Sequence, residues 1–213
     1  MNKWIMAGTA AAFTGAAAFA RSEYERIHLD IVHYDIKTDK LGLEWNGFKA
    51  VFLSDLHDNS FGMENEELLA AIEKEQPDIV VIGGDMLVVK EWAAPHFDML
   101  ANLYKKLVKR YPVYYAFGNH EQRMKEEPLT YPGWWQSYWK VLKDSGMHVL
   151  VNKSEEIIKN DTAMRISGIT LPRECYRKGR IPSLSAGYID KKIGKASDKN
   201  FELLLAHTPT FAK

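Results

Sequence analysis

Three short apolar runs in this chain end in glycine or in side chains that bind metals, and a segment whose apolar residues have helical spacing follows each run. The apolar runs span residues 51–53, 78–82 and 112–117. The helical segments span residues 64–76, 97–110 and 134–146. Runs of this length are typical of strands that are buried on both faces. Strand and helix in alternation predict an α/β fold with a parallel sheet at its core.

The residues that end these runs are the ones suited to chemistry. The first run ends in Asp55 and His57, and residues two apart on an extended strand point to the same face. The later runs end in Gly84-Asp85 and in Gly118-Asn119-His120-Glu121. Taken alone, an Asp-x-His pair is also compatible with a capping aspartate and a surface histidine. Because ligands bind at the carboxyl edge of such sheets, we expect all these side chains to meet at one site.

The second half of the chain has a different pattern. Residues 155–159 and 164–170 have the composition of short strands around a turn, and residues 148–151 form another short strand before them. One more apolar run, residues 201–206, ends in His207. The stretch before that run carries a basic cluster, which consists of Arg173, Arg177, Lys178 and Arg180. This cluster either meets an anionic substrate or belongs to a solvated loop.

Several other features have two interpretations each. Alternating polar and apolar residues over 28–36 predict a half-exposed strand, which makes His28 and His33 surface residues. Arg123 either holds a phosphate oxygen or is an ordinary surface arginine. An aromatic cluster after the third run either forms an apolar wall for the substrate or packs against the core. That cluster consists of Trp134, Trp135 and Trp139.

Composition limits the classes of protein that remain. The 213 residues are enough for one large domain with a substantial core. The 28 Lys and Arg residues equal the 28 Asp and Glu residues, so the chain lacks the basic excess that a nucleic-acid partner requires. Cys175 is the single cysteine, which excludes an intrachain disulfide.

The N-terminal segment has the layout of an export signal. One lysine precedes the uncharged residues 4–20, and Ala18-Phe19-Ala20 has the small-x-small form of a cleavage site. The same run is just long enough for an uncleaved membrane anchor, and a buried alanine-rich helix is the remaining alternative. We therefore expect residues 1–22 to be a signal peptide or membrane anchor. The protein would then lie at the extracytoplasmic face of the cell membrane, or be secreted if the segment is cleaved.

In this order and at these strand ends, the motifs resemble those of the calcineurin-like metallophosphoesterase family. The resemblance rests on Asp55-x-His57, Gly84-Asp85, Gly118-Asn119-His120-Glu121 and His207, and it covers about residues 48–210. The lead-in and the Ser-Asp-Leu-His form resemble the membrane-anchored bacterial branch of the family. The resemblance implies a four-layer α/β/β/α sandwich of two mixed sheets with flanking helices, over residues 23–213.

The resemblance also implies a centre of two divalent metal ions. Asp55 and His57 would bind the first metal, Asp85 would bridge both metals, and Asn119 and His207 would bind the second. Mixed carboxylate, amide and imidazole ligands favour Mn, Fe or Zn over Ca. Two such cations screen the charge of a phosphate and lower the pKa of a shared water, which supplies hydroxide near neutral pH.

Two motif residues have implied catalytic roles instead. His120 would stand beside the substrate and donate a proton to the leaving oxygen, which a histidine can do near pH 7. Glu121 would orient and polarise that histidine. The predicted function is hydrolysis of a phosphomonoester, phosphodiester or pyrophosphate bond in a small-molecule or lipid-linked substrate. The alternative is a non-catalytic binding module with the same fold.

The sequence departs from the family in one respect. In the family, a Gly-His-x-His motif follows the position of His207 and gives each metal one more ligand. That motif is absent from these 213 residues. We therefore expect the domain to be incomplete at its C-terminus, and we expect this chain by itself to bind metal weakly and to have little or no activity.

Overall fold

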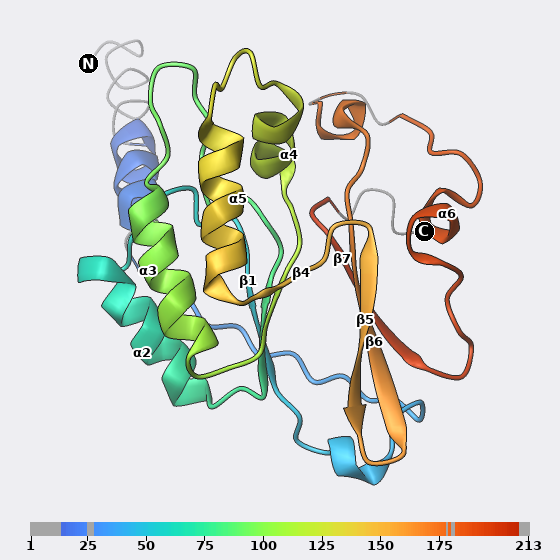
Figure 1. The fold of residues 1–213 in the computed structure, drawn as a ribbon. Helices are drawn as coiled ribbons and strands as arrows, with labels where there is room; N and C mark the ends of the chain where they lie inside the picture. The colour runs from blue at the N-terminus through green and yellow to red at the C-terminus, as the bar shows by residue number, and fades with distance from the viewer. Residues whose placement is uncertain (1–13, 25–27, 178, 180–181, 209–213) are drawn as a thin grey trace, which may run out of the picture.

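The computed structural model describes residues 14–24, 28–177, 179 and 182–208. They form two sheets that lie face to face between helices (Figure 1). A layer of helices covers the outer face of the first sheet, and a short helix lies beside the second sheet. The order of layers is therefore helix, sheet, sheet, helix.

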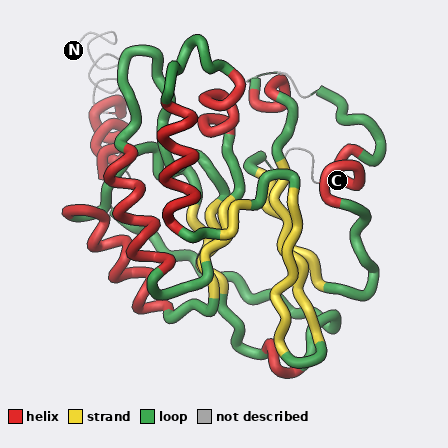
Figure 2. Tube along the Cα trace, viewed as in Figure 1, coloured by secondary structure: helices red, strands yellow, loops and turns green. Residues whose placement is uncertain are grey.

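The first sheet is parallel and its strands lie side by side in chain order. The strands are β1 (Ala50–Leu53), β2 (Ile79–Ile82), β3 (Val113–Tyr115) and β4 (His148–Val149). The connecting helices are α2 (Glu66–Glu75), α3 (Phe97–Val108), α4 (Asn119–Glu126) and α5 (Trp134–Ser145). Because crossovers between parallel strands are right-handed, strands added in one direction place every connecting helix on the same face. Figure 2 shows these helices on one side of the strands.

The second sheet is mixed. Its strands are β5 (Lys153–Lys159), β6 (Thr162–Ile169) and β7 (Phe201–Ala206). The first two form an antiparallel hairpin, and β7 pairs in parallel with β6. Helix α6 (Tyr188–Ile193) contacts β5 and β6. The remaining elements are three short 3-10 helices, η1 (Leu43–Trp45), η2 (Met63–Asn65) and η3 (Arg173–Tyr176).

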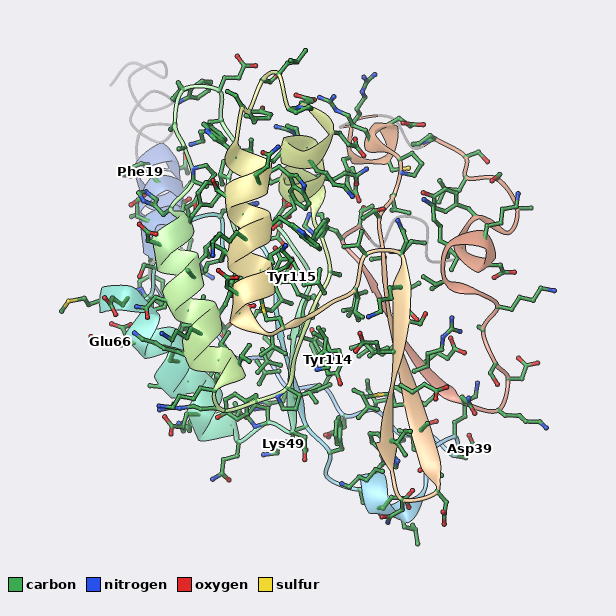
Figure 3. All side chains as sticks on the ribbon, viewed as in Figure 1. Phe19, Asp39, Lys49, Glu66, Tyr114 and Tyr115 are labelled. Carbon is green, nitrogen blue, oxygen red and sulfur yellow. The ribbon has the colours of Figure 1, made fainter. Side chains whose placement is uncertain are left out.

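The strands of the first sheet divide the core into two layers. Val80 and Ile82 pack on the helices, whereas Ile79 and Val81 pack against the second sheet. The same division appears on β3, where Tyr115 lies on the helix side and Tyr114 on the side of the second sheet (Figure 3). Burial on both faces explains the continuous apolar runs in the sequence.

The predicted α/β fold with two sheets and flanking helices is confirmed. The expectation that both sheets are mixed holds only for the second, because each connection in the first sheet returns through a helix and leaves its described strands parallel. Strand β1 is less buried than expected. It pairs only with β2 in the described residues, and Phe52 is 62% exposed.

The predicted strand over residues 28–36 is wrong. These residues form no strand in the structure, because they lie along the surface of the helix layer and do not pair with a sheet. Leu29 packs against the helix-side core, and Nε2 of His33 lies 2.8 Å from Oε2 of Glu75. Leu29 is the one partly buried residue of this segment, and Ile31, Val32, Tyr34 and Ile36 are exposed, so the alternation does not correspond to a covered and an open side.

The predicted signal or anchor, residues 1–22, lies largely outside the described residues. Residues 14–24 are helical. Within the part of the chain that the structure describes, no helix combines the length and the apolar character needed to cross a bilayer.

Candidate metal centre

The predicted site residues come from the ends of four strands. Three of those strands, β1, β2 and β3, belong to the first sheet, and β7 belongs to the second. Asp55 and His57 follow β1, Asp85 follows β2, Asn119 follows β3 and His207 follows β7. The structure brings these side chains together at the carboxyl edge of the sandwich, as ligand sites in such sheets require.

Two glycines let the ends of β2 and β3 approach each other. Gly84 has a φ of +96°, and a Cβ at this position would lie 2.0 Å from the backbone nitrogen of Gly118. A Cβ on Gly118 would lie 2.1 Å from Oδ1 of Asp85. Any side chain at either position would therefore push apart the loops that carry Asp85 and Asn119.

The backbone after β1 does not continue as an extended strand. Asp55, His57 and Asp58 have φ values of 57°, 53° and 58°, and Asp85 has a φ of 51°. Left-handed conformations cost about 1–2 kcal/mol per non-glycine residue, and such strain gathers at functional sites. Asp55 and His57 do converge, with Nε2 of His57 3.8 Å from Oδ1 of Asp55. The expected reason, two residues on one face of a strand, is wrong, because two left-handed residues bring them together.

Asp85 lies at the middle of the cluster and is 2% exposed. Its Oδ1 accepts a hydrogen bond of 2.8 Å from the backbone N–H of His120, at the N-terminus of α4. Its Oδ2 lies 3.2 Å from Nε2 of His207 and 3.3 Å from Nε2 of His57. Burial alone would raise the pKa of Asp85. The hydrogen bonds from His207 and the His120 backbone, with the charges of those two histidines, outweigh burial and lower that pKa to about 2.

The orientation of His207 is the one that metal-binding histidines have. Its Nδ1–H donates to the backbone oxygen of Gly83 at 3.0 Å, so Nε2 faces the cluster. The partner on the outer nitrogen fixes both the tautomer and the ring orientation. Burial lowers the pKa of His207, but the hydrogen bond to Asp85 and the charge of Asp85 raise it to about 9. A cation bound at Nε2 replaces the proton that this pKa places there.

Asn119 adds an oxygen to the same group of acceptors. Its side-chain oxygen faces Nε2 of His207 and Oδ2 of Asp85, each at 3.3 Å. Turning the amide over would give hydrogen bonds to both atoms, whereas the orientation with the oxygen inward suits a cation. The candidate ligands are therefore oxygen and nitrogen acceptors that point at one region, and this donor chemistry fits a divalent metal ion.

The ligand atoms form two groups that share Asp85. Asp55, Asp85 and His207 form one group, and His57, Asp85 and His120 form the other. Within each group, all ligand atoms lie within 4.8 Å of one another. Asp55 lies near both groups, because its Oδ1 is 3.8 Å from Nε2 of His57 and 3.9 Å from Nε2 of His207.

His120 is held by a backbone contact rather than by an acid. Its Nδ1 accepts a hydrogen bond of 3.0 Å from the N–H of Val89, so the neutral ring carries its proton on Nε2. That nitrogen lies 3.9 Å from Oδ2 of Asp85. Burial, followed by the positive charges of Arg123 and the neighbouring histidines, lowers the pKa of His120, although Asp85 raises it. His120 therefore presents an N–H group toward the cluster.

The predicted contact between Glu121 and His120 is wrong. Glu121 is fully buried and accepts hydrogen bonds from the backbone N–H groups of Asp85 (3.0 Å), Met86 (3.1 Å) and Gly118 (2.9 Å). Consecutive residues on a helix point about 100° apart, so Glu121 faces inward while His120 faces the site. Burial and the charge of Asp85 raise the pKa of Glu121 to about 7. Glu121 thus holds together the two loops that carry Asp85 and Asn119.

Residues 48–212 match the family model described as calcineurin-like phosphoesterase. The chain belongs to this family. It is also 28% identical, over 157 residues, to an uncharacterized metallophosphoesterase, YkoQ, of Bacillus subtilis (strain 168). That alignment covers 74% of this chain and 52% of YkoQ, so the chain spans about half the length of this curated relative.

A chain of buried tyrosines lies behind the ligands of this calcineurin-like phosphoesterase domain. Tyr115 donates to Oε1 of Glu121 at 2.6 Å, and its hydroxyl lies 2.6 Å from that of Tyr138. The hydroxyl of Tyr104 lies 2.8 Å from that of Tyr138. The hydrogen bonds connect β3 and α4 with α3 and α5, and sequence analysis did not find them. In the sequence, these hydrogen bonds are indicated only by three tyrosines at positions that the helical and strand patterns assign to the core.

A pocket of about 150 Å³ lies beside the candidate metal centre of the phosphoesterase domain. Its lining residues are Asn119, Gln122, Arg123, Glu126, Arg173, Tyr176 and Arg177. Arg123 and two members of the predicted basic cluster therefore meet next to a candidate ligand. Lys178 and Arg180 lie outside the described residues. The tryptophans after the third strand are partly buried against the helix-side core, and Trp135 packs at 5.5 Å from the ring of Phe117.

Proposed function

We propose that the protein is a metal-dependent phosphohydrolase that cleaves a phosphoester or pyrophosphate bond. The observation that carries this proposal is the geometry around Oδ2 of Asp85. Acceptor atoms of Asp55, His57, Asn119 and His207 converge on it, and the N–H of His120 stands beside them. Membership of the calcineurin-like phosphoesterase family supports the same reaction class.

Two divalent cations, Mn, Fe or Zn, would be held by these side chains. Asp55 and His57 would hold the first ion, Asn119 and His207 would hold the second, and Asp85 would be common to both. When bound, the two ions screen the charge of the phosphate and lower the pKa of water, which makes a nucleophile available near neutral pH. Asp85 belongs to both groups of ligand atoms, which supports a carboxylate common to the two ions. Those groups pair Asp55 with His207 and His57 with His120, so the proposed division of the other ligands follows the family resemblance, in which His120 is not a ligand.

The side chains of this protein supply orientation and a proton. The backbone N–H of Val89 holds the His120 ring so that its Nε2–H points toward the cluster. His120 donates that proton to the oxygen of the leaving group as the P–O bond breaks. Arg123, whose positive charge lowers the pKa of His120, lines the pocket beside Asn119 and adds positive charge next to the bound substrate. Glu121 keeps the loops of Asp85 and Asn119 at a fixed separation.

The place of action and the substrate are part of the same proposal. Residues 1–22 act as a signal peptide or membrane anchor, because an uncharged run follows a single lysine. The domain then acts at the extracytoplasmic face of the cell membrane, or in the medium after cleavage. Its substrate is a small-molecule or lipid-linked phosphoester. The balanced charge of the chain supports a partner other than nucleic acid.

The test is hydrolysis of an aryl phosphate ester by the full-length protein. The metal-free protein, prepared with a chelator, is assayed before and after addition of Mn²⁺, Fe²⁺ or Zn²⁺. We expect activity only with metal, and none in Asp85→Ala with any of the three ions. Activity that survives chelation would overturn the proposal. Absence of activity with every metal, despite bound metal, would support the alternative of a non-catalytic binding module.

A further inference from the structure

The pocket beside Asn119 is built by one face of a helix and one short 3-10 helix. Four of its lining residues are spaced as one face of α4, namely Asn119, Gln122, Arg123 and Glu126. The facing wall is η3 with the residue after it, and the two elements contact each other. Nε2 of Gln122 donates to the backbone oxygen of Leu171 at 3.0 Å, and Arg173 forms an ion pair with Glu127. The wall formed by η3 is thus fastened to α4.

The pocket opens next to the candidate metal centre. Asn119 belongs to the lining of the pocket and also faces Asp85 and His207. On the other wall, the ring of Tyr176 lies 6.1 Å from the ring of His207. A group bound in the pocket is therefore separated from the metal centre by little more than the side chain of Asn119.

Positive charge dominates the lining. It contains the guanidinium groups of Arg123, Arg173 and Arg177 and one carboxylate, that of Glu126. The Glu126 carboxylate accepts a hydrogen bond of 2.7 Å from Gln122. In the described residues no carboxylate pairs with Arg123 or Arg177, whereas Arg173 has Glu127. Guanidinium groups bind phosphate through two parallel hydrogen bonds, and they exclude a further metal ion.

The volume fits one group of this kind. At about 150 Å³, the pocket has room for a group of several non-hydrogen atoms and not only for a single water. This space suits a single phosphate group with part of what it is attached to. A phosphate in the pocket and a phosphate at Asp85 would be near neighbours, because Asn119 contributes to both places.

We propose that this pocket binds a second phosphate group of the substrate, in addition to the one that is hydrolysed. The preferred substrates are then diphosphate esters, in which the two phosphates are directly linked, rather than simple phosphomonoesters. The inference deepens the proposed function and rests on it for the identity of the reacting phosphate. Free inorganic phosphate would bind to the same arginines. The two experiments below distinguish it from a phosphate group of the substrate.

The first experiment measures phosphate binding without catalysis. Full-length protein is made metal-free, and its affinity for inorganic phosphate is measured by calorimetry. We expect Arg177→Ala and Arg123→Ala each to weaken binding by about tenfold or more, the usual cost of losing a charged hydrogen bond. Arg110→Ala is the matched control, because Arg110 is an exposed arginine with one carboxylate partner, Glu73, on the far part of the helix layer. Equal affinity in the wild type and both pocket variants would overturn the proposal.

The second experiment measures selectivity. The ratio of kcat/KM for an aryl diphosphate ester to kcat/KM for an aryl monophosphate ester is determined with metal present. We expect this ratio to fall about tenfold in Arg177→Ala, partly in Arg177→Lys, and not at all in Arg110→Ala. An unchanged ratio in Arg177→Ala would overturn the assignment to a substrate and favour free phosphate. If neither ester is hydrolysed but phosphate binding still depends on the arginines, the proposed function fails and the pocket remains a phosphate site without a substrate.

Discussion

The two sheets contribute unequally to the candidate metal centre. The parallel sheet supplies Asp55, His57, Asp85 and Asn119 from the ends of three neighbouring strands. The second sheet supplies His207 alone, from a strand that pairs with one neighbour in the described residues. The parallel sheet therefore builds most of the centre, and the second sheet closes it with one ligand.

The hydrogen bonds that hold the ligands in place also differ between the two sheets. Glu121 accepts three backbone hydrogen bonds and one from Tyr115, and these bonds fix the loops of Asp85 and Asn119 from inside the core. His207 has one hydrogen bond to a group outside the ligands, from Nδ1 to the backbone oxygen of Gly83, and its Nε2 contacts Asp85, which is itself a candidate ligand. Changes on the first-sheet side should therefore disturb several ligands together, whereas changes on the second-sheet side should disturb one.

The largest expected effect belongs to Asp85→Ala in the full-length protein. This change removes the carboxylate shared by both groups of ligand atoms. We expect metal content and activity to be lost together, which metal analysis and an aryl phosphate assay would measure. Full activity in Asp85→Ala would show that the buried carboxylate common to both groups is not needed, and the role given to the first sheet would be wrong.

Glu121→Ala should give the next largest effect, on stability. It leaves three buried N–H groups without an acceptor, at about 1–3 kcal/mol each. We expect the free energy of unfolding of metal-free protein to fall by about 3 kcal/mol or more in urea denaturation. Glu126→Ala, on the exposed side of the same helix, is the control and should change stability by less than about 0.5 kcal/mol. Similar values for the two variants would show that Glu121 does not hold the loops.

His207→Ala tests the second-sheet side. We assign His207 as a ligand of one metal ion only. We therefore expect that ion to bind more than about 100-fold more weakly and the second ion to be retained. Stepwise metal titration followed by calorimetry measures this directly. His148→Ala is the control, since that histidine pairs with Glu155 outside the centre. Loss of both metals in His207→Ala would mean that the two sheets contribute equally.

Tyr138→Phe should have the smallest effect. It removes the hydroxyl that joins Tyr104 to Tyr115, so the buried Tyr104 hydroxyl loses its partner. We expect a loss of about 1–2 kcal/mol in the free energy of unfolding, from one unsatisfied buried hydroxyl. Tyr111→Phe, at a partly buried position on the same core, serves as the control and should be near neutral.

The sequence predicted the parts of the fold that follow from apolar periodicity. Strands β1, β2 and β3 and helices α2, α3 and α5 lie where their patterns indicate. Helix α4 was not predicted, because Met124 is its single buried apolar residue and gives no periodic signal. The strand expected over 28–36 is absent although the polar and apolar alternation is present, because Ile31, Val32, Tyr34 and Ile36 are exposed and have no core to pack against.

In the candidate centre, the sequence predicted which residues meet but not how they are held. Position at strand ends was enough to bring Asp85 and His207 together, because the topology determines where those ends lie. The partners of Glu121 were beyond reach, since the N–H groups of Asp85 and Met86 are 36 and 35 residues away in the chain. Side-chain hydrogen bonds over such separations depend on packing that no local pattern encodes.

The candidate centre keeps its metal ligands distinct from its proton donor, and His120 is the residue at which this division can be measured. The measurement is the metal content and turnover of full-length His120→Ala, loaded with Mn²⁺ beside the wild type. We expect the metal content of the wild type, about two ions per chain, with turnover lower by about 10²–10⁴-fold. The loss should shrink for substrates whose leaving groups need no proton. Metal loss equal to that of Asp85→Ala would show instead that His120 is a ligand. Its place in the group with His57 and Asp85 also permits that role.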